Sequence, residues 1–434
     1  MQSTLEAPNP LPARAGGPTD PSHDEELRRG LIRTDIERRT AWLLVLAFLL
    51  AIFAVPLAQA YLEHREDEES PLLDLFRRAP TAENLRQLEK DVEEASYPKA
   101  YVQPLMQLEL TRRGRVGNKL AIVGRSGWLY YKPGVLHVGG PGLLDADVRA
   151  SRQKDALDAG EEPLAADPRP AILGFHRALE RRGIRLVLLP VVDKAALAAQ
   201  HLHGRPLRNW PKNADYDALL TDLQRQGVAV FDMRRELGAP AAESLFLIQD
   251  THWTPSFMER QARALARFVN AAAPLPPLPA PALKTAPQPV SRVGDIVDML
   301  KLPDSQTAFL PQTVTVNQVQ DSSGAPWEPD LKADVLLLGD SFTNIFSLEG
   351  MGWGLAAGLA PHLAMQLGRP LDVIAQNDSG AFATRQALSR ELAAGSDRLA
   401  GKRVVIWEFA ARELSAGDWK LLDYAVGAST EAAP

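Results

Sequence analysis

The feature that most constrains this chain of 434 residues is a run of 22 uncharged residues from Ala41 to Leu62, which reads AWLLVLAFLLAIFAVPLAQAYL. A membrane-spanning helix needs about 20 predominantly apolar residues, so this run is long enough to cross a bilayer. It can be a signal anchor that stays in the membrane, a signal peptide cleaved after the small residues Ala58-Gln59-Ala60, or a buried helix of a soluble protein. The 40 residues before it are long for a signal peptide, which favours the anchor.

The charges on either side of this run predict its orientation. Five arginines lie in the 20 residues before it, whereas the segment EHREDEE that follows it contains five acids and one arginine. Lys and Arg near the ends of a membrane helix concentrate on the cytoplasmic side. We therefore expect a single-pass protein of the inner membrane, with a cytoplasmic N-terminus and everything from Glu63 onward outside the cytoplasm.

The composition excludes several classes of protein. The chain has no cysteine, which excludes a disulfide scaffold, a thiolate zinc site, an iron–sulfur cluster and a cysteine nucleophile. Its net charge is −6, whereas a nucleic-acid-binding protein typically carries an excess of basic residues, so we expect no nucleic-acid partner. The sequence has no HExxH motif, and its close histidine pair, His201 and His203, lies in a polar stretch that favours a structural or exposed role, so we predict no metal site.

The remaining segments differ in character. Residues 1–40 start with a stretch rich in Pro, Gly and charge, which predicts a disordered cytoplasmic tail before the anchor at 41–62. Residues 63–118 are charged, with leucines at helical spacing, and predict a helical stalk or cap. Residues 119–427 predict one α/β catalytic domain. Within it, residues 271–290 hold seven prolines, so we expect a loop without regular structure there.

The α/β prediction depends on short apolar runs that alternate with helical stretches. The predicted strands are Ile184–Pro190, Val228–Phe231, Asp334–Leu338, Leu371–Ala375 and Arg403–Phe409. The predicted helices cover residues 170–183, 213–226, 254–270, 354–368 and 383–396. Strands that are apolar throughout and separated by helices indicate a parallel sheet with helices on both faces.

One predicted strand runs directly into the tripeptide Gly339-Asp340-Ser341. In open α/β sheets, ligands bind at the carboxyl ends of the strands, and the backbone N–H groups of a tight turn can face a developing oxyanion. Ser341 is therefore a candidate nucleophile. The alternative is that Asp340 or Ser341 only caps a following helix.

An aspartate and a histidine lie two residues apart in the segment QDTHWT, just before the predicted helix at 254–270. In an extended segment, such side chains point to the same side. Asp250 could then orient the imidazole while His252 accepts a proton, which is the part of a Ser–His–Asp triad that a serine completes. The alternative is that Asp250 is a helix N-cap and His252 an ordinary loop residue.

Other candidates follow the ends of later strands or the serine itself. The candidates for oxyanion or substrate binding are Asn344, Asn377, Gly380, Arg385 and Arg412. For each of them, a helix cap or a structural salt bridge is the alternative. The early segment GRSGWLYY, residues 124–131, predicts a turn that leads into an aromatic strand packed in the core.

Together and in this order, the motifs resemble the alginate O-acetyltransferase family, whose catalytic domain is SGNH-hydrolase-like, over roughly residues 119–415. The markers are G-x-x-G-W-L-Y at Gly124–Tyr130, D-x-H-W-T at Asp250–Thr254, G-D-S-F at Gly339–Phe342 and I-W-E-F…R-E-L at Ile406–Leu414. Ordinary SGNH hydrolases place the serine block first and a D-x-x-H block last. Here Asp-x-His precedes the serine by 89 residues, in the permuted order of the acetyltransferase family.

The resemblance implies a serine-dependent O-acetyltransferase that acetylates hydroxyls of an exopolysaccharide, alginate or another, in the periplasm. It implies a triad of Ser341, His252 and Asp250, an acetyl-serine intermediate, and no cofactor. It also implies partners, namely an MBOAT-type membrane acyltransferase that relays the acetyl group and other polysaccharide-secretion proteins. Two alternatives stay open: a polysaccharide acetylesterase with the same triad, and a non-catalytic scaffold of a secretion complex. The complete triad disfavours the scaffold.

Overall fold

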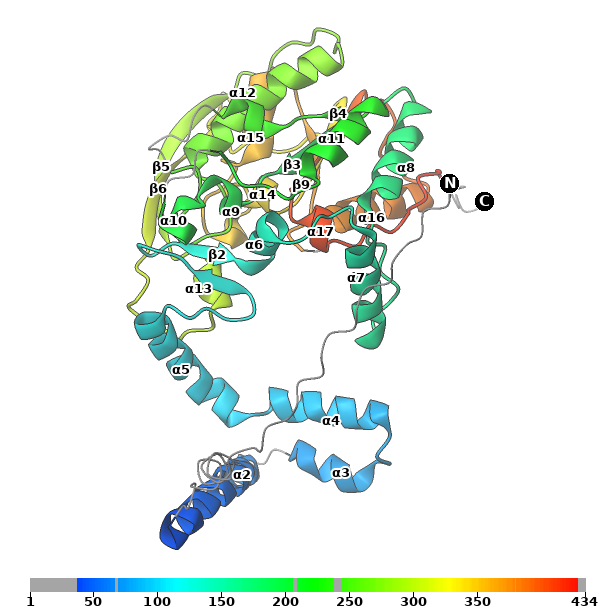
Figure 1. Ribbon diagram of the computed structural model, residues 1–434. Helices are drawn as coiled ribbons and strands as arrows, with labels where there is room; N and C mark the ends of the chain where they lie inside the picture. The colour runs from blue at the N-terminus through cyan, green and yellow to red at the C-terminus, as the bar shows by residue number, and fades with distance from the viewer. Residues whose placement is uncertain (1–36, 67–68, 206–208, 238–243, 379, 428–434) are drawn as a thin grey trace, which may run out of the picture. The chain divides into compact units, whose positions relative to one another are not determined.

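The computed structural model of the protein describes residues 37–66, 69–205, 209–237, 244–378 and 380–427. The chain divides into two compact units, Met1–Val102 and Gln103–Pro434 (Figure 1). The division lies inside the segment 63–118, which the sequence predicts as one stalk. Its last part, with α5 (Gln103–Glu109) and η3 (Leu110–Gly114), therefore belongs to the second unit. Most of the predicted tail, residues 1–36, lies outside the described residues.

The first unit contains the long apolar helix α2 (Arg38–Arg65), which extends three residues beyond the uncharged run at each end. At 1.5 Å per residue, a helix of 28 residues is about 42 Å long. Its most apolar stretch has a mean hydropathy of 2.7 and is not covered by the rest of the chain. Within the part of the chain that the structure describes, α2 alone is long and apolar enough to span a membrane, which is consistent with an anchor.

Short helices complete the first unit. They are η1 (Pro71–Leu73), α3 (Asp74–Arg77), α4 (Ala82–Glu94) and η2 (Pro98–Val102). The turn after α4 is fixed to α2, because Gln59 Nε2 donates to Ala95 O at 2.7 Å and Tyr97 N donates to Gln59 Oε1 at 2.9 Å. Gln59, a polar side chain near the end of the apolar helix, thus has partners in the turn after α4 as well as Glu63 within α2.

A five-stranded parallel sheet lies at the centre of the second unit (Figure 1). Its strand order is β4 (Ala229–Val230), β3 (Arg185–Val191), β9 (Val404–Ala410), β7 (Val335–Gly339) and β8 (Asp372–Ala375). All four neighbouring pairs are parallel. Each strand overlaps the apolar run predicted for it. Every residue of β7 and β9 is buried, which explains why their sequences lack a regular polar alternation.

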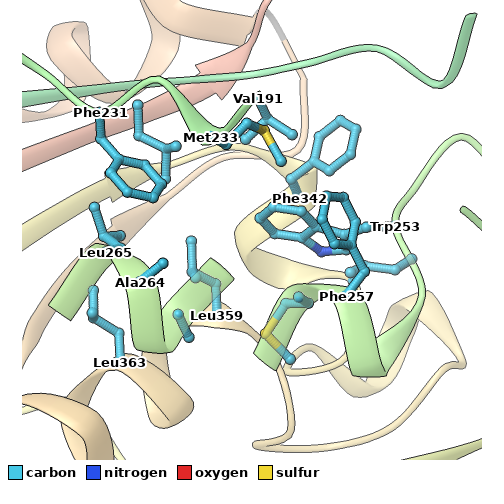
Figure 2. Close-up of a cluster of buried hydrophobic side chains, with 14 of the residues drawn as sticks. Val191, Phe231, Met233, Trp253, Phe257, Ala264, Leu265, Phe342, Leu359 and Leu363 are labelled. Carbon is cyan, nitrogen blue, oxygen red and sulfur yellow. The ribbon is translucent and has the colours of Figure 1, made fainter. Parts of the chain in front are cut away.

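Two hydrophobic clusters cover the two faces of this sheet, because successive side chains of a strand point to opposite sides. One cluster contains α12 (Pro255–Ala272) and α15 (Leu359–Leu367) (Figure 2). The other contains α8 (Pro168–Glu180), α11 (Tyr216–Arg225) and α16 (Gly380–Ala393). All five helices overlap the predicted ones. Helix α15 begins later than predicted, because Ala356 has a left-handed φ of 49° and Gly358 is the N-cap.

Smaller elements surround the sheet. The strands β1 (Ala121–Val123) and β2 (Leu129–Tyr131) form an antiparallel hairpin. The helices of the second unit not named so far are α6 (Lys132–Gly139), α7 (Ala146–Asp158), α9 (Lys194–Leu197), α10 (Gln200–His203), η4 (Met233–Glu236), α13 (Asp295–Met299), α14 (Ser341–Asn344), η5 (Glu349–Met351) and α17 (Glu413–Ala416). The turn predicted at residues 124–131 lies in the β1–β2 hairpin.

The expectation that residues 271–290 carry no regular structure is wrong for part of that segment. Residues 274–283 contain neither helix nor strand, but β5 (Lys284–Arg292) pairs with β6 (Gln312–Gln320) in an antiparallel ribbon. Two of the seven prolines, Pro287 and Pro289, lie inside β5. In a two-stranded ribbon, alternate N–H groups point away from the partner, so prolines two residues apart can share the free edge and remove no ladder hydrogen bond.

Candidate active site

Ser341 lies at the carboxyl end of β7, as the first residue of α14. The residue that caps this helix is Asp340, whose side chain accepts a hydrogen bond of 2.8 Å from Phe342 N. The turn is tight at Gly339, where an added Cβ would lie 2.2 Å from Thr343 Oγ1. Because Asp340 performs the capping, the hydroxyl of Ser341 is left to face another group.

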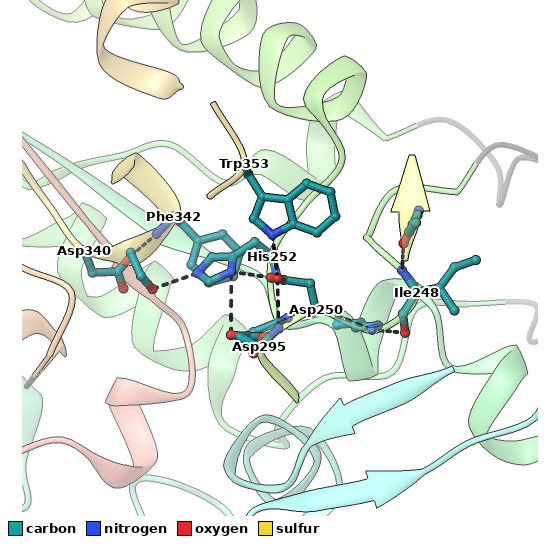
Figure 3. A network of polar contacts seen from close by, with 11 residues as sticks. Ile248, Asp250, His252, Asp295, Asp340, Phe342 and Trp353 are labelled. Carbon is teal, nitrogen blue, oxygen red and sulfur yellow. Dashed lines mark hydrogen bonds and ion pairs between the residues drawn. The ribbon is translucent and has the colours of Figure 1, made fainter. Parts of the chain in front are cut away.

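That group is His252, which lies in the loop before α12. His252 Nε2 lies 2.8 Å from Ser341 Oγ, and His252 Nδ1 lies 2.6 Å from Asp250 Oδ1 (Figure 3). Asp250 and His252 are only 1% and 2% exposed. A hydroxyl, an imidazole and a carboxylate connected in this order are the arrangement that activates a serine nucleophile. The structure thus brings together the three residues that the sequence predicts as a triad.

The core holds both sides of this contact in place. Phe342, the neighbour of Ser341, packs edge-on against Trp253, the neighbour of His252, with ring centroids 5.3 Å apart (Figure 2). Both side chains are fully buried. The segments that carry the nucleophile and the base are therefore joined directly behind the reacting atoms.

The Asp250 carboxylate has partners beyond the imidazole. Its Oδ1 also accepts from His252 N at 3.1 Å, and its Oδ2 accepts from Asp295 N at 3.1 Å and from Trp353 Nε1 at 2.9 Å (Figure 3). Burial alone would raise the pKa of Asp250. The hydrogen bond and charge of His252 and the backbone donors outweigh it, so the pKa of Asp250 lies below its ordinary value and the carboxylate stays ionised.

A second carboxylate, Asp295, lies beside the imidazole. Its Oδ2 is 3.9 Å from His252 Nδ1, and its Oδ1 accepts a hydrogen bond of 2.7 Å from Thr251 N. Burial and the charge of Asp250 raise the pKa of Asp295 to about 6. For His252, burial lowers the pKa, but the hydrogen bond to Asp250 and the charges of Asp250, Asp295 and Asp340 raise it above its ordinary value.

Beneath the nucleophile lies a buried acid on the neighbouring strand β9. Glu408 Oε2 accepts from Asp340 N at 2.9 Å and from Thr343 Oγ1 at 2.8 Å. Asp340 Oδ2 in turn accepts from Ala410 N at 2.8 Å. Burial and the adjacent charge of Asp340 raise the pKa of Glu408 well above its ordinary value, which favours its neutral form. These bonds connect the serine turn to the central strand.

Three of the weaker candidates lie near the strand ends. Asn344, at the end of α14, donates from Nδ2 to Asn377 Oδ1 at 2.8 Å, and Asn377 follows β8. Gly380 begins α16, while position 379 before it lies outside the described residues. The two asparagines are therefore in contact with each other, on the helix of the nucleophile and on the loop beside it.

The two arginines have different surroundings. Arg385 is 0% exposed, and its guanidinium lies 4.9 Å from the ring centroid of Trp407. A side chain enclosed in the core cannot contact a substrate, so the predicted substrate role of Arg385 is corrected to a structural one. Arg412 has a side chain that is 12% exposed, and its guanidinium lies 5.8 Å from the Phe342 ring and 3.3 Å from Asp193 Oδ1. Arg412 thus lies near the ring of Phe342, the residue that follows the nucleophile.

Donor atoms of Asp250, His252 and Asp295 lie within 4.8 Å of one another, which is close enough to hold a cation. A histidine binds a metal ion only through a ring nitrogen that carries no proton. His252 Nδ1 faces an ionised carboxylate and therefore carries a proton, and Nε2 faces the serine hydroxyl. A cation here would have to replace the bond between His252 and Asp250.

Sequence reasoning missed Asp295, Trp353 and the position of Glu408 under the serine turn. Asp295 and Trp353 reach Asp250 from segments far along the chain and belong to no motif. One sequence signal points to Asp295, because it follows a glycine. An added Cβ at Gly294 would lie 2.3 Å from Gln249 O, so this glycine allows the chain to approach the Asp250 loop closely.

A family match and several similar proteins were found for this chain. Residues 121–411 match a family described as SGNH hydrolase-like domain, acetyltransferase AlgX. The chain is 26% identical over 315 residues to a probable alginate O-acetylase AlgJ of Pseudomonas syringae pv. tomato, covering 72% of each chain. It is 24% identical to the Pseudomonas putida AlgJ over 71% of this chain and 73% of that one. The solved O-acetyltransferase domain of Pseudomonas putida AlgJ is similar with a TM-score of 0.48 and 20% identity, covering 69% of this chain and 93% of the domain.

Proposed function

This chain belongs to the SGNH hydrolase-like acetyltransferase family of AlgX, and from that membership and the site geometry we propose that it transfers acetyl groups to hydroxyls of an exopolysaccharide through an acetyl-serine intermediate on Ser341. That it is an O-acetyltransferase follows from the family. The acetyl-serine mechanism is supported by two contacts of His252. Its Nε2 lies 2.8 Å from Ser341 Oγ, and its Nδ1 lies 2.6 Å from Asp250 Oδ1. Alginate is the acceptor named for its relatives and is the first polymer to test.

The first half-reaction loads the serine. His252 Nε2 accepts the proton of Ser341 Oγ while Oγ attacks the carbonyl carbon of an acetyl ester or thioester. The tetrahedral intermediate collapses, the bond between the carbonyl carbon and the leaving group breaks, and the leaving group takes the proton from His252. Asp250 stays ionised throughout and stabilises the imidazolium, as its low pKa allows.

Backbone and amide donors near Ser341 stabilise the oxyanion of each tetrahedral intermediate. Ser341 is the first residue of a helix, where backbone N–H groups have no intrahelical acceptor. Asn377 uses its Oδ1 to accept from Asn344, which leaves its Nδ2 group to donate to another acceptor. We assign the oxyanion hole to Ser341 N–H and Asn377 Nδ2, with Gly380 N–H as a further candidate, and Arg412 to contact with the acceptor.

The second half-reaction decides between transferase and esterase. In transfer, His252 takes the proton of a sugar hydroxyl, the sugar oxygen attacks the acetyl carbonyl, and Ser341 Oγ leaves and recovers a proton. In an esterase, water takes the place of the sugar. Membership in an acetyltransferase family favours the sugar.

The location of the reaction is a further part of the proposal. Helix α2 would anchor the protein in the inner membrane, and the five arginines before it favour a periplasmic catalytic domain. Acetyl-CoA is cytoplasmic, so the acetyl group would have to be relayed across the membrane. A membrane-embedded acyltransferase of the MBOAT type is the partner that the family resemblance implies, and other polysaccharide-secretion proteins would receive the product.

The test uses the full-length protein in detergent with a chromogenic acetyl ester, with and without oligomers of mannuronate. Ser341→Ala should abolish release of the chromophore and the acetylated-enzyme mass. Ser389→Ala, which loses a hydroxyl on α16 that bonds to Asp423 O, is the matched control and should keep both. Full activity in Ser341→Ala would overturn the nucleophile assignment. Free acetate as the sole product with every oligosaccharide offered would favour the esterase.

A further inference from the structure

A buried lysine lies behind the proposed triad and takes no part in the chemistry above. Lys194 is the first residue of α9, just beyond the carboxyl end of β3, and is 4% exposed. Its Nζ donates to Ile248 O at 2.8 Å and to Asp250 O at 2.9 Å. A buried ammonium group is costly unless its hydrogen bonds are satisfied, so this lysine needs those two carbonyls.

Two aromatic rings complete the surroundings of this ammonium group. Lys194 Nζ lies 5.0 Å from the ring centroid of Trp128 and 5.3 Å from that of Tyr130, distances at which a ring face attracts a cation. Each ring is itself held, because Trp128 stacks on His201 with centroids 4.1 Å apart and Tyr130 donates from its hydroxyl to Ala198 O at 2.6 Å. These aromatic residues come from the G-x-x-G-W-L-Y segment, to which the proposed reaction gives no role.

The same hairpin also binds the loop through its backbone. Leu129 N donates to Ile248 O at 3.0 Å, so this carbonyl is held by both β2 and Lys194. From the other side, Ile296 N donates to Gln249 O at 3.2 Å. The loop that leads to His252 is therefore fixed at successive carbonyls, and Lys194 is the donor that reaches the carbonyl of Asp250 itself.

We propose that Lys194, enclosed by Trp128 and Tyr130, is a positioning residue that holds the Asp250–His252 loop at the distance from Ser341 that acetyl transfer needs. The proposal rests on the proposed function, because it assigns Lys194 to the same triad. Lys194 does not touch the reacting atoms and acts through the backbone of Asp250. The proposal also assigns a role to the G-x-x-G-W-L-Y segment, whose Trp128 and Tyr130 rings enclose the ammonium group of Lys194.

The test variant is Lys194→Met in the full-length protein, which keeps the length of the side chain and removes its donors and charge. A small displacement of a catalytic group can reduce a rate by about 10²-fold, so we expect kcat for acetyl-ester turnover to fall about 10- to 100-fold. The KM should change less than about twofold, because the variant leaves the surface that contacts substrate intact.

The pH profile gives a second readout that a purely structural role would not change. Lys194 faces the carboxylates of Asp250 and Asp295 and the imidazole of His201, and burial lowers its pKa to about 7, so it is mostly cationic in more acidic solution. Removing that cation favours the imidazolium of His252 and raises the pKa of His252. Since only neutral His252 acts as the base, the acid limb of kcat/KM should move to higher pH in Lys194→Met.

Lys402 supplies a matched control. It is also a buried lysine, and its Nζ donates to Leu331 O and Ala333 O, both at 2.7 Å, next to Asp372 at the opposite end of the sheet. Lys402→Met should lower the thermal midpoint but leave the kcat and the pH profile of the folded protein unchanged. The same kcat loss and pH shift in Lys402→Met would overturn the proposal, as would an unchanged kcat in Lys194→Met.

Two further variants make the result decisive. If Lys194→Met does not fold, Trp128→Phe takes its place, because it keeps the lysine and weakens its aromatic enclosure. A fall in kcat of about threefold or more at constant KM supports the proposal, and an unchanged kcat overturns it. Ser341→Ala separates this idea from the proposed function. An inactive Ser341→Ala beside a fully active Lys194→Met rejects only the positioning role, whereas an active Ser341→Ala rejects the proposed function itself.

Discussion

Trp353 donates its indole N–H to Asp250 Oδ2 at 2.9 Å, on the oxygen that His252 does not use. Both side chains are buried, so this hydrogen bond to a charged group is shielded from water. It fixes the plane of the carboxylate and thereby the direction in which His252 points. The indole comes from a segment 103 residues beyond the aspartate, which connects the Asp–His loop to the half of the domain that carries the nucleophile.

Replacing this indole tests its contribution to catalysis. Trp353→Phe keeps an aromatic ring and removes the donor, so Asp250 loses a hydrogen bond of the kind worth about 1.5–3 kcal/mol. We expect kcat/KM for acetyl-ester turnover to fall about 10-fold. Trp419→Phe is the control, since Trp419 Nε1 donates to Glu413 O in the opposite cluster, and it should lower stability without changing kcat. Equal activity in the two variants would contradict the role of Trp353.

Asp295 should set the acid limit of activity. Its carboxylate lies 3.9 Å from His252 Nδ1 and favours the imidazolium, so its removal lowers the pKa of His252. Activity needs neutral His252, and Asp295→Asn should therefore move the acid limb of kcat/KM to lower pH, by about 0.5–1 unit. Asp298→Asn, an exposed acid on the same short helix, should leave the limb unchanged. A shift to higher pH in Asp295→Asn would contradict this assignment.

Replacing Arg385 should lower the stability of the protein, whereas replacing Arg412 should lower its activity. Arg385→Met removes a cation enclosed by aromatic rings, which should cost about 2 kcal/mol or more of unfolding free energy. The activity of the folded Arg385→Met protein should stay within about twofold of the wild type. Arg412→Met should instead reduce kcat/KM for the saccharide acceptor. Denaturant unfolding and acceptor kinetics on both proteins check this, and reversed effects would exchange the two roles.

The asparagine pair should show which amide acts on the oxyanion. A single oxyanion donor is worth about 10²–10³ in kcat, and Asn377→Ala should fall in that range. Asn344→Ala removes the donor that orients Asn377, a neutral hydrogen bond worth about 1 kcal/mol, and should cost about 5-fold. A larger loss in Asn344→Ala than in Asn377→Ala would assign the oxyanion contact to Asn344 instead.

Sequence patterns predict this fold well where one physical rule dominates. The strands of the buried sheet are apolar throughout, so β3, β7 and β9 could be located within one or two residues. The proposed triad could be suggested because the Asp-x-His spacing and the serine after a strand are local features. The ribbon strand β5 was missed because prolines normally exclude a strand, and only the pairing with β6 shows that they lie on a free edge.

Other features depend on contacts that no local pattern encodes. Lys194 looks like a charged residue at the start of a surface helix, and only the folded chain encloses it. Arg385 follows a strand end in sequence, as a substrate-binding residue would, but its side chain turns into the core. Trp353 and Asp295 reach Asp250 from segments 103 and 45 residues away, so their roles follow from tertiary packing alone.

The strand order of the sheet has a consequence for biosynthesis. The last strand among the described residues, β9, occupies the middle of the sheet and pairs with β3 on one side and β7 on the other. Until residues 404–410 have left the ribosome, the pairs β3–β4 and β7–β8 have no strand to join them. Long-range pairings of this kind form late and slowly. A chain stopped before residue 404 would therefore hold every proposed triad residue and still lack the strand that joins the two halves of the sheet.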